Sequence, residues 1–162
     1  MEIRPLEPAE WQLLREIRLT ALQDAPGAFS STYEGEVAFG EDIWRGRLAN
    51  GGFFAAFDGD RAVGIAAGYR DDAEPADRRE LVSMWISPAA RGQRIAGRLV
   101  TAVTDWARAD GAKELALWVV IDNGAARAAY ERLGFVANGE RQPVRPDEPD
   151  RIEERMLLSV SA

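Results

Sequence analysis

The stretch from Ser83 to Val100 reads SMWISPAARGQRIAGRLV, and its pattern decides the fold. Its apolar start is typical of a strand, which Pro88 ends because proline cannot donate to a sheet ladder. A turn rich in glycine and arginine follows, and from about Ile95 apolar residues recur at helical spacing. The segment therefore predicts a strand that passes through this turn directly into a helix.

The turn is predicted to bind an anion. Backbone N–H groups at the start of a helix have no partner within it, and those beside Gly92 and Gly97 should point outward. Each negative charge placed there gains about 0.3–1 kcal/mol. Residues 88–113 carry five basic and two acidic side chains, so a phosphate-bearing ligand is the simplest interpretation. Solvated arginines on an outer helix face remain the alternative, and neither a dinucleotide fingerprint nor a P-loop is present.

Periodicity predicts the elements on the N-terminal side of this stretch. They are an extended segment from Ile3, a helix over 8–23, a second helix around 43–48, two strands over 53–57 and 62–70, a polar loop over 71–79 and a strand over 80–87. The Asp58-Gly59 step between two apolar runs indicates that the paired strands form a hairpin.

On the C-terminal side, the helix that begins near Gln93 should end at Gly111. The strand over 114–121 is apolar on both alternating sets, so we expect it to be the most buried strand. A helix from the N-cap Asn123 to Gly134 comes next, and two strands over 135–141 and 155–160 flank a loop over 143–150. This order predicts a single α/β (α+β mixed sheet) domain over residues 1–162, covered by helices and not regularly doubly wound.

The amino-acid composition excludes several classes of catalytic and metal-binding groups. The 162 residues contain no cysteine and no histidine, which excludes disulfides, thiolate nucleophiles, imidazole bases and His/Cys metal sites. The net charge of −7 argues against nucleic acid as a partner. No signal peptide and no apolar run of membrane-spanning length is present, so we expect a cytoplasmic protein without a membrane partner.

The segment Arg91-Gly92-Gln93-Arg94-Ile95-Ala96 resembles the pyrophosphate-binding motif of the GNAT superfamily of N-acetyltransferases, Gln/Arg-x-x-Gly-x-Gly/Ala. Arg94 stands where the family usually has glycine. Because the first turn of a helix has negative φ, we expect Arg94 to keep the backbone contact and to add its guanidinium group to a phosphate. The segments NGAARAAYERLGF (123–135) and REIRLTALQDAPGAFSSTYEGE (15–36) also resemble the family, so the resemblance covers nearly the whole chain.

The resemblance implies a GNAT-like acyl-CoA N-acyltransferase fold, in which the pantetheine arm of coenzyme A lies between two splayed central strands. In this chain those strands are 80–87 and 114–121. The residues that it assigns to the cofactor are the backbone of Met84, Trp85 and Ile86, the pyrophosphate cradle from Arg91 to Gly97, and Asn123, Ala126 and Tyr130 near the sulfur.

Acetyl transfer needs a proton for the departing thiolate and a base for the amine. A thiol has a pKa of about 8.5 and a tyrosine one of about 10, so Tyr130 can supply the proton. Glu80 is the first candidate for the base, followed by Glu34 and Glu36. The alternatives are that Tyr130 packs in the core and that the carboxylates are solvated. Trp85 is expected to line the acceptor site.

The sequence therefore predicts an acetyl-CoA-dependent N-acetyltransferase that uses no metal and acts on a primary amine of a small molecule. Without a cysteine, direct transfer in a ternary complex is favoured. Acetylation of a protein N-terminus or lysine is the alternative within the enzyme class. A non-catalytic acyl-CoA-binding sensor is the alternative from another class. The resemblance also suggests a homodimer.

Overall fold

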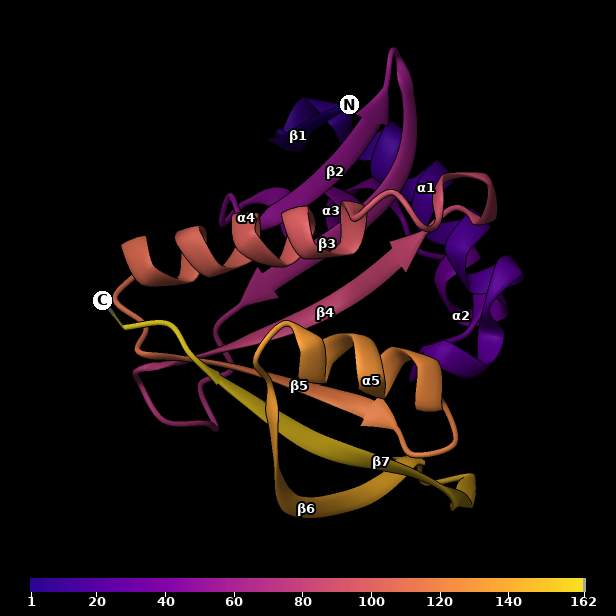
Figure 1. Ribbon diagram of the computed structural model, residues 1–162. Coiled ribbons are helices and arrows are strands. Elements are labelled where there is room, and N and C mark those ends of the chain that lie inside the picture. The colour runs from indigo at the N-terminus through magenta and orange to yellow at the C-terminus, as the bar shows by residue number, and fades with distance from the viewer. Residues whose placement is uncertain (162) are drawn as a thin grey trace.

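One mixed sheet of seven strands forms the centre of the computed structural model, which describes residues 1–161 (Figure 1). The strand order is β1-β2-β3-β4-β5-β7-β6. Only β4 and β5 run parallel, and every other neighbouring pair is antiparallel. The strand bounds are β1 (Glu2–Pro5), β2 (Phe53–Asp58), β3 (Arg61–Tyr69), β4 (Arg78–Ile86), β5 (Glu114–Val120), β6 (Val136–Arg145) and β7 (Glu148–Ser159). The predicted mixed sheet is confirmed.

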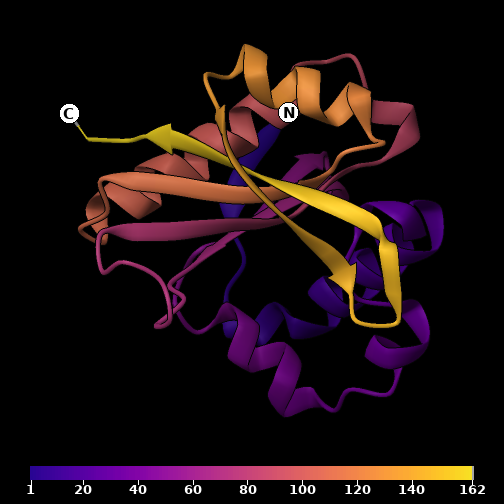
Figure 2. The ribbon, with the colours of Figure 1, turned by 90° about the horizontal axis from the view of Figure 1, so that it is seen from below.

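Helices cover both faces of the sheet (Figure 2). One face carries α1 (Trp11–Asp24), α2 (Tyr33–Val37) and α3 (Glu41–Leu48), and the other carries α4 (Ile95–Ala109) and α5 (Gly124–Arg132). Short 3-10 helices occupy Pro8–Glu10, Pro26–Ala28 and Pro88–Ala90. Each face has its own apolar cluster, one around Trp44 and Leu14 under the N-terminal helices and one around Leu99 and Leu115 under α4.

Two glycines of β3 allow α4 to lie close to the sheet. A Cβ atom on Gly68 would stand 2.6 Å from Cζ3 of Trp106 in α4, and one on Gly64 would stand 3.3 Å from Cδ1 of Leu99 in α4 and 2.9 Å from Cδ1 of Ile86 in β4. Real Cβ atoms do not approach other atoms so closely, because dense interiors leave no spare volume. The helix α4 therefore lies close against β3.

Most predicted elements are confirmed. The helix expected over 8–23 is a 3-10 turn followed by α1, and the hairpin is β2 and β3 with Gly59 at φ 62° between them. Gly111 and Gly134 have φ angles of 90° and 101° directly after the ends of α4 and α5, as expected of C′ residues. The sequence did not reveal α2, because five residues are too few to show a helical period.

Two expectations are wrong. The most buried strand is β3, with six consecutive buried residues, because helices cover both of its faces, whereas one face of β5 lines an open cavity at Trp118. The loop expected over 143–150 is a two-residue turn at 146–147 between extended β6 and β7, in which Pro143 pairs with Ile152. Since β6 lies at the edge of the sheet, the missing N–H of Pro143 can face outward without breaking a ladder.

Candidate active site

The two parallel strands separate shortly after they meet. Residues Arg78, Arg79 and Glu80 of β4 pair with residues 114–116 of β5, and no further pair joins these strands within residues 1–161. Figure 1 shows them diverging towards the carboxyl end of β4. A strand edge without a partner can accept an extended ligand through its backbone groups. The splayed strands implied by the resemblance are therefore present.

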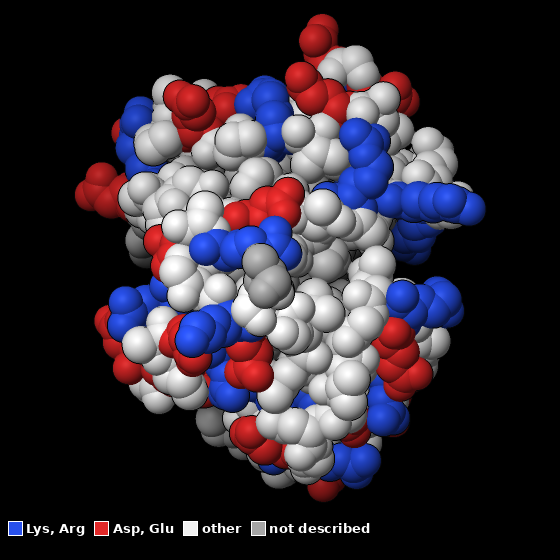
Figure 3. Space-filling view, turned by 60° about the vertical axis from the view of Figure 1, so that its left-hand side comes forward, with Lys and Arg blue, Asp and Glu red and all other residues white. Residues whose placement is uncertain are grey.

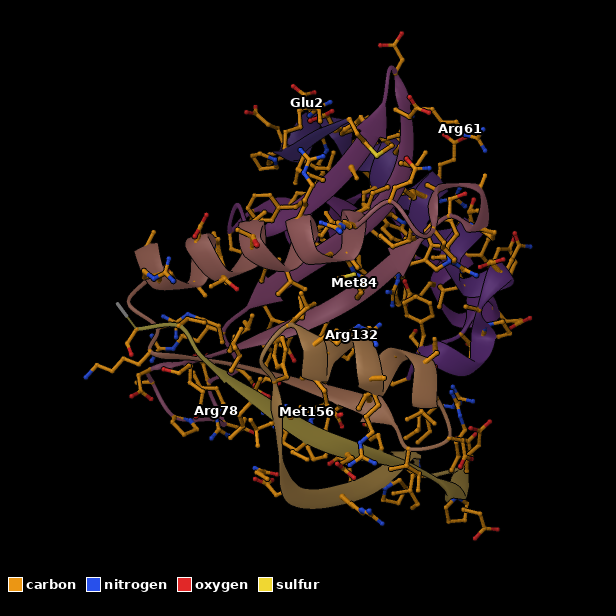
Figure 4. The ribbon with its side chains drawn as sticks, in the orientation of Figure 1. Glu2, Arg61, Arg78, Met84, Arg132 and Met156 are labelled. Carbon is orange, nitrogen blue, oxygen red and sulfur yellow. The ribbon has the colours of Figure 1, made fainter. Side chains whose placement is uncertain are left out.

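The predicted arm-binding residues lie on this diverging part of β4. Met84 and Ile86 are partly buried against the apolar cluster of the α4 face, and Figure 4 shows Met84 in the region between α4 and α5. Trp85 points the other way, into the cluster under the N-terminal helices, and its indole nitrogen donates to Asp24 at 3.0 Å. The carbonyl of Ile86 accepts a hydrogen bond from Nε of Arg91 at 3.0 Å.

A β-bulge marks the place where β4 leaves β5. Ala67 of β3 pairs with Val82 and Ile65 pairs with Trp85, so β4 holds one extra residue there. Ser83 has a φ of 60°, a conformation that a non-glycine residue rarely adopts. Its hydroxyl accepts a hydrogen bond from Arg18 of α1 at 2.9 Å. The bulge is thereby tied to the N-terminal helices.

The turn between β4 and α4 has two residues in the left-handed region. Gly92 has a φ of 82°, and Arg94, the N-cap of α4, has φ 62° and ψ 22°. The expectation that Arg94 has a negative φ is wrong, because Arg94 precedes the first helical residue, Ile95, and is not part of the helix. Glycine, which the family motif usually has at this position, carries no Cβ penalty in this conformation.

The first turn of α4 leaves N–H groups free for a ligand, as the sequence predicted. Gln93 and Arg94 are exposed just before it, and Ala96 and Gly97 within it are partly exposed. The side chain of Arg91 instead bonds Asp24 at 3.0 Å. Thus the backbone cradle fits an anion such as a pyrophosphate, and the exposed side chains of Arg94 and Arg98 stand beside it.

On the far side of the split, Asn123 caps α5. Its Oδ1 accepts from the backbone N–H of Ala126 at 3.2 Å, as predicted. Ala126 and Tyr130 follow on one face of α5 and pack against the cluster under α4. The ring of Tyr130 meets that of Phe135 edge to face at 5.6 Å, and its hydroxyl has no hydrogen-bond partner within residues 1–161. Burial raises the pKa of Tyr130 to about 12.

On the opposite face of the sheet, an open cavity of about 800 Å³ lies between the strands and the N-terminal helices. Glu80, Val82 and Ser83 of β4 and Trp118 of β5 line it beside the split. The expectation that Trp85 lines the acceptor site is wrong for this cavity, because the bulge turns Trp85 into the core. The sequence missed several residues of its wall, namely Arg18, Arg47, Tyr69, Trp118, Gln142 and Glu153.

Glu80 is held in a buried ion pair. Both of its oxygens accept from the guanidinium group of Arg155, at 2.6 and 2.7 Å. The same guanidinium stacks 4.8 Å from the ring centre of Trp118. The carboxylate is therefore at the predicted position beside the split, and it is fully occupied by a fixed partner.

Of the other two candidate bases, Glu36 is buried and Glu34 is exposed on the surface of α2. Glu36 bonds Arg18 at 2.9 and 3.0 Å and Arg47 at 2.7 Å. Burial alone would raise the pKa of Glu36, but hydrogen bonds from Arg18, Ser31 and Arg47 lower it to about 2. A carboxylate held this way is a poor proton acceptor, and its position fixes α2 to α1 and α3.

Fold and site together define a class of protein. The fold combines two splayed strands, a turn with free backbone N–H groups at a helix start, and an open cavity on the opposite face of the sheet. The sequence profile described as the Acetyltransferase (GNAT) family matches residues 11–135, and the chain belongs to that family.

Curated relatives agree with this assignment. N-alpha-acetyltransferase 30 of Schizosaccharomyces pombe is 39% identical over 83 residues, which cover 51% of this chain and 55% of that protein. N-acetyltransferase 8F1 of Rattus norvegicus is 33% identical over 103 residues, which cover 62% of this chain and 47% of that protein. The chain thus spans about half the length of the curated relatives it matches.

Solved structures share the fold over nearly the whole chain. The yncA protein of Salmonella typhimurium, determined with its cofactor acetyl-CoA, has a TM-score of 0.75 at 17% identity and covers 100% of this chain and 95% of that one. Aminoglycoside 6'-acetyltransferase type Ii has a TM-score of 0.75 at 18% identity, covering 100% and 99%. The ribosomal-protein-S18-alanine N-acetyltransferase of Escherichia coli has a TM-score of 0.68 at 20% identity, covering 99% and 94%.

Proposed function

We propose that this chain is an acetyl-CoA-dependent N-acetyltransferase that transfers the acetyl group directly to a primary amine of a small molecule. The observation that carries the proposal is the split between β4 and β5. At one end of the split lies the turn with its free N–H groups, and across the sheet lies the cavity lined by Val82, Ser83 and Trp118. A donor held in the split would reach an amine in that cavity.

The residues present fit coenzyme A. The turn from Arg91 to Gly97 offers unpaired backbone N–H groups at a helix N-terminus, where phosphates bind. Its glycine at position 92 has the positive φ that the turn requires. Met84, Trp85 and Ile86 would bind the arm through their backbone, and Asn123 and Ala126 would contact it near the sulfur. When bound, acetyl-CoA supplies an activated thioester.

Tyr130 is the proposed general acid. Its hydroxyl is free of protein partners within residues 1–161, and its raised pKa keeps the proton on the oxygen throughout the range in which enzymes work. A proton donor of this kind would protonate the departing thiolate. The absence of cysteine from the 162 residues favours direct transfer over a route through a thioester on the protein.

The hairpin of β6 and β7 supports a small acceptor. Arg145, near its tip, donates to the carbonyl of Ser30 at 3.2 Å, and Arg151 donates to the carbonyl of Gly27. Figure 2 shows this tip bending towards the N-terminal helices. The contacts close one side of the cavity, whose volume of about 800 Å³ suits a small molecule. A protein acceptor would need these contacts between the hairpin and the N-terminal segment to break.

A two-stage experiment tests the proposal. Thermal melts with acetyl-CoA, NAD and ATP come first, and acetyl-CoA alone should stabilise the fold, by roughly 2.7 kcal/mol at 100 times its dissociation constant. Thiol release is then measured with a panel of small amines and with peptides that have free N-termini. Equal shifts for the three ligands would refute the donor site, and faster turnover of peptides would favour the protein alternative. Binding without turnover of any amine would favour the sensor.

The remaining expectations about location and partners stay predictions. No helix within residues 1–161 is long and apolar enough to span a membrane. On the side of the molecule shown in Figure 3, acidic and basic side chains are interspersed. Cytoplasmic location and a homodimer rest on the sequence and on the family resemblance, and gel filtration with light scattering tests the latter.

A further inference from the structure

Four acidic side chains line the acceptor cavity, and their partners differ. Glu80 is bound by Arg155, and Glu74 is bound by Arg78 at 2.9 Å. Asp71 and Glu153 form no ion pair within residues 1–161, and of these two only Glu153 is buried, with 8% of its surface exposed. Glu153 is therefore the one buried carboxylate in this wall, among the residues described, that no cation neutralises at short range.

The position of Glu153 leaves one of its oxygens available. It lies on β7 opposite Val120, the last residue of β5, and its Oε1 accepts from Nε2 of Gln142 on β6 at 3.0 Å. Oε2 has no hydrogen-bond partner within residues 1–161, yet it is not among the buried unpartnered atoms of that range. Because the side chain lines the cavity, this oxygen is accessible to a molecule bound there.

The environment of Glu153 favours its protonated form more than water does. Burial raises the pKa of Glu153, while the Gln142 hydrogen bond and the charges of Arg151 and Arg155 partly oppose this. The charged and titratable groups that share its cavity wall are Arg18, Arg47, Tyr69, Asp71, Glu74 and Glu80. A carboxylate with a raised pKa is a better proton acceptor than an ordinary one.

We propose that Glu153 receives the ammonium group of the acceptor and removes one proton from it before acetyl transfer, a role that the sequence assigned to Glu80. The step breaks one N–H bond of the ammonium group and forms one O–H bond on Glu153. The neutral amine keeps the electron pair with which it attacks the thioester, and Glu153 returns the proton to solvent through the open mouth of the cavity. This assignment rests on the proposed function.

Glu80 is less suited to the same role because of its partner. A proton on Glu80 would disrupt the two short bonds to Arg155, whose side chain is almost fully buried. The other carboxylate that forms an ion pair with Arg155, among the residues described, is Glu74 at 3.6 Å, and it already binds Arg78. Protonating Glu80 would thus leave a buried guanidinium poorly neutralised. The ion pair of Glu80 and Arg155 instead has a structural role, because the guanidinium group packs on the ring of Trp118 beside the split.

The test compares kcat/KM against pH for the parent and for Glu153→Gln, using the best amine of the panel. The parent should lose activity as the pH falls through the pKa of Glu153, below the range in which the amine itself titrates. Glu153→Gln should lower kcat/KM by about 100-fold or more and abolish that acidic limb. The dissociation constant of acetyl-CoA, measured by calorimetry, should not change, because Glu153 lies on the acceptor side of the sheet.

Two further variants sharpen the result. Glu140→Gln removes an exposed carboxylate from the same hairpin and should behave as the parent. Glu153→Asp keeps the carboxylate but withdraws it by one methylene, so it should retain the acidic limb at a reduced rate. If Glu153→Gln fails to fold in melts, Glu153→Asp decides, and an unreduced rate for it overturns the assignment.

The possible failures are distinguishable. If the parent is active and Glu153→Gln stays within threefold of it, or keeps the acidic limb, Glu153 is a wall residue and only this assignment is overturned. If Glu80→Gln rather than Glu153→Gln removes the limb, the base is Glu80. If the parent releases no thiol with any acceptor, the proposed function falls and this assignment falls with it.

Discussion

Replacing Arg94 by glycine should stabilise the fold, whereas replacing it by alanine should not. Arg94 has φ 62° and ψ 22°, in the left-handed region. Any residue with a Cβ atom is strained there, because the Cβ approaches the following carbonyl oxygen. Glycine removes that strain, and alanine retains it while still removing the guanidinium group. The two variants therefore separate the backbone effect from the side-chain effect.

The magnitude follows from two opposing contributions. Relieving the strain of the left-handed conformation raises the free energy of unfolding by about 1–2 kcal/mol. Glycine also makes the unfolded chain more flexible, which costs about 0.4–1 kcal/mol. The side chain of Arg94 is exposed, so little packing is lost with it. The expected net gain for Arg94→Gly is about 1 kcal/mol, or an increase in Tm of roughly 2–4 °C for a domain of this size.

Thermal melts without ligand measure the backbone effect, and calorimetry with acetyl-CoA measures the side-chain effect. If the guanidinium group binds a phosphate, both variants should weaken acetyl-CoA binding by roughly 1.5–3 kcal/mol. If only the backbone binds, both should bind as the parent does. A Tm for Arg94→Gly at or below that of Arg94→Ala would refute the argument, because it would mean that the left-handed conformation carries no strain at this position.

Three further predictions concern catalysis, pH and packing. Tyr130→Phe keeps the ring and should lower kcat by about 10²–10⁴-fold without loss of acetyl-CoA affinity, and no alkaline limb below about pH 11 should belong to Tyr130, because its pKa is about 12. Glu36 has a pKa lowered from 4.5 to about 2, so it contributes on the order of 3 kcal/mol above pH 4.5, which is lost as the pH falls towards 2. Gly68→Ala should destabilise the fold by about 1–3 kcal/mol, because its Cβ would meet Trp106 at 2.6 Å.

Each of these has an outcome that would contradict it, and the last has a matched control. Turnover of Tyr130→Phe within threefold of the parent, with chemistry rate-limiting, would make Tyr130 a packing residue. Glu36→Gln should flatten the loss of stability between pH 4.5 and 2 in denaturant titrations, and an unchanged slope there would contradict the ion-pair argument. Gly46→Ala, in α3 with no atom within 4 Å of the new Cβ, should stabilise by about 0.5–1 kcal/mol, the opposite sign to Gly68→Ala.

The sequence predicted those features that depend on neighbours along the chain. The caps at Asn123 and Gly134 and the hairpin at Gly59 depend on residues within one or two turns, and each was placed correctly. The φ of Arg94 was predicted wrongly. The sign of φ depends on whether the residue lies just inside or just before the helix, and sequence patterns locate helix ends only to within a few residues.

The cavity wall depends on pairs that are far apart in the sequence. Glu80 meets Arg155 across 75 residues, and Arg18 meets Ser83 across 65. Sequence periodicity does not predict such long-range contacts. The sequence therefore indicated Glu80 as a candidate base without revealing its ion pair with Arg155. Trp85 was misplaced for a related reason, since one extra residue at the bulge reverses which face the following side chains occupy.

The sheet divides the work of the proposed reaction between its two faces. The turn before α4, Asn123 and Tyr130 all belong to the side covered by α4 and α5, while Glu153 and the cavity belong to the side covered by α1 and α3. The two faces of the sheet are connected through the gap where β4 separates from β5. At this point Arg18 holds the bulge at Ser83 by a hydrogen bond. A substitution of a cavity residue away from this bulge, such as Gln142, therefore touches neither the turn before α4 nor the helix itself. Two solved structures with the same fold bear names that refer to an aminoglycoside in one case and to a ribosomal protein in the other, so this fold alone does not identify the acceptor.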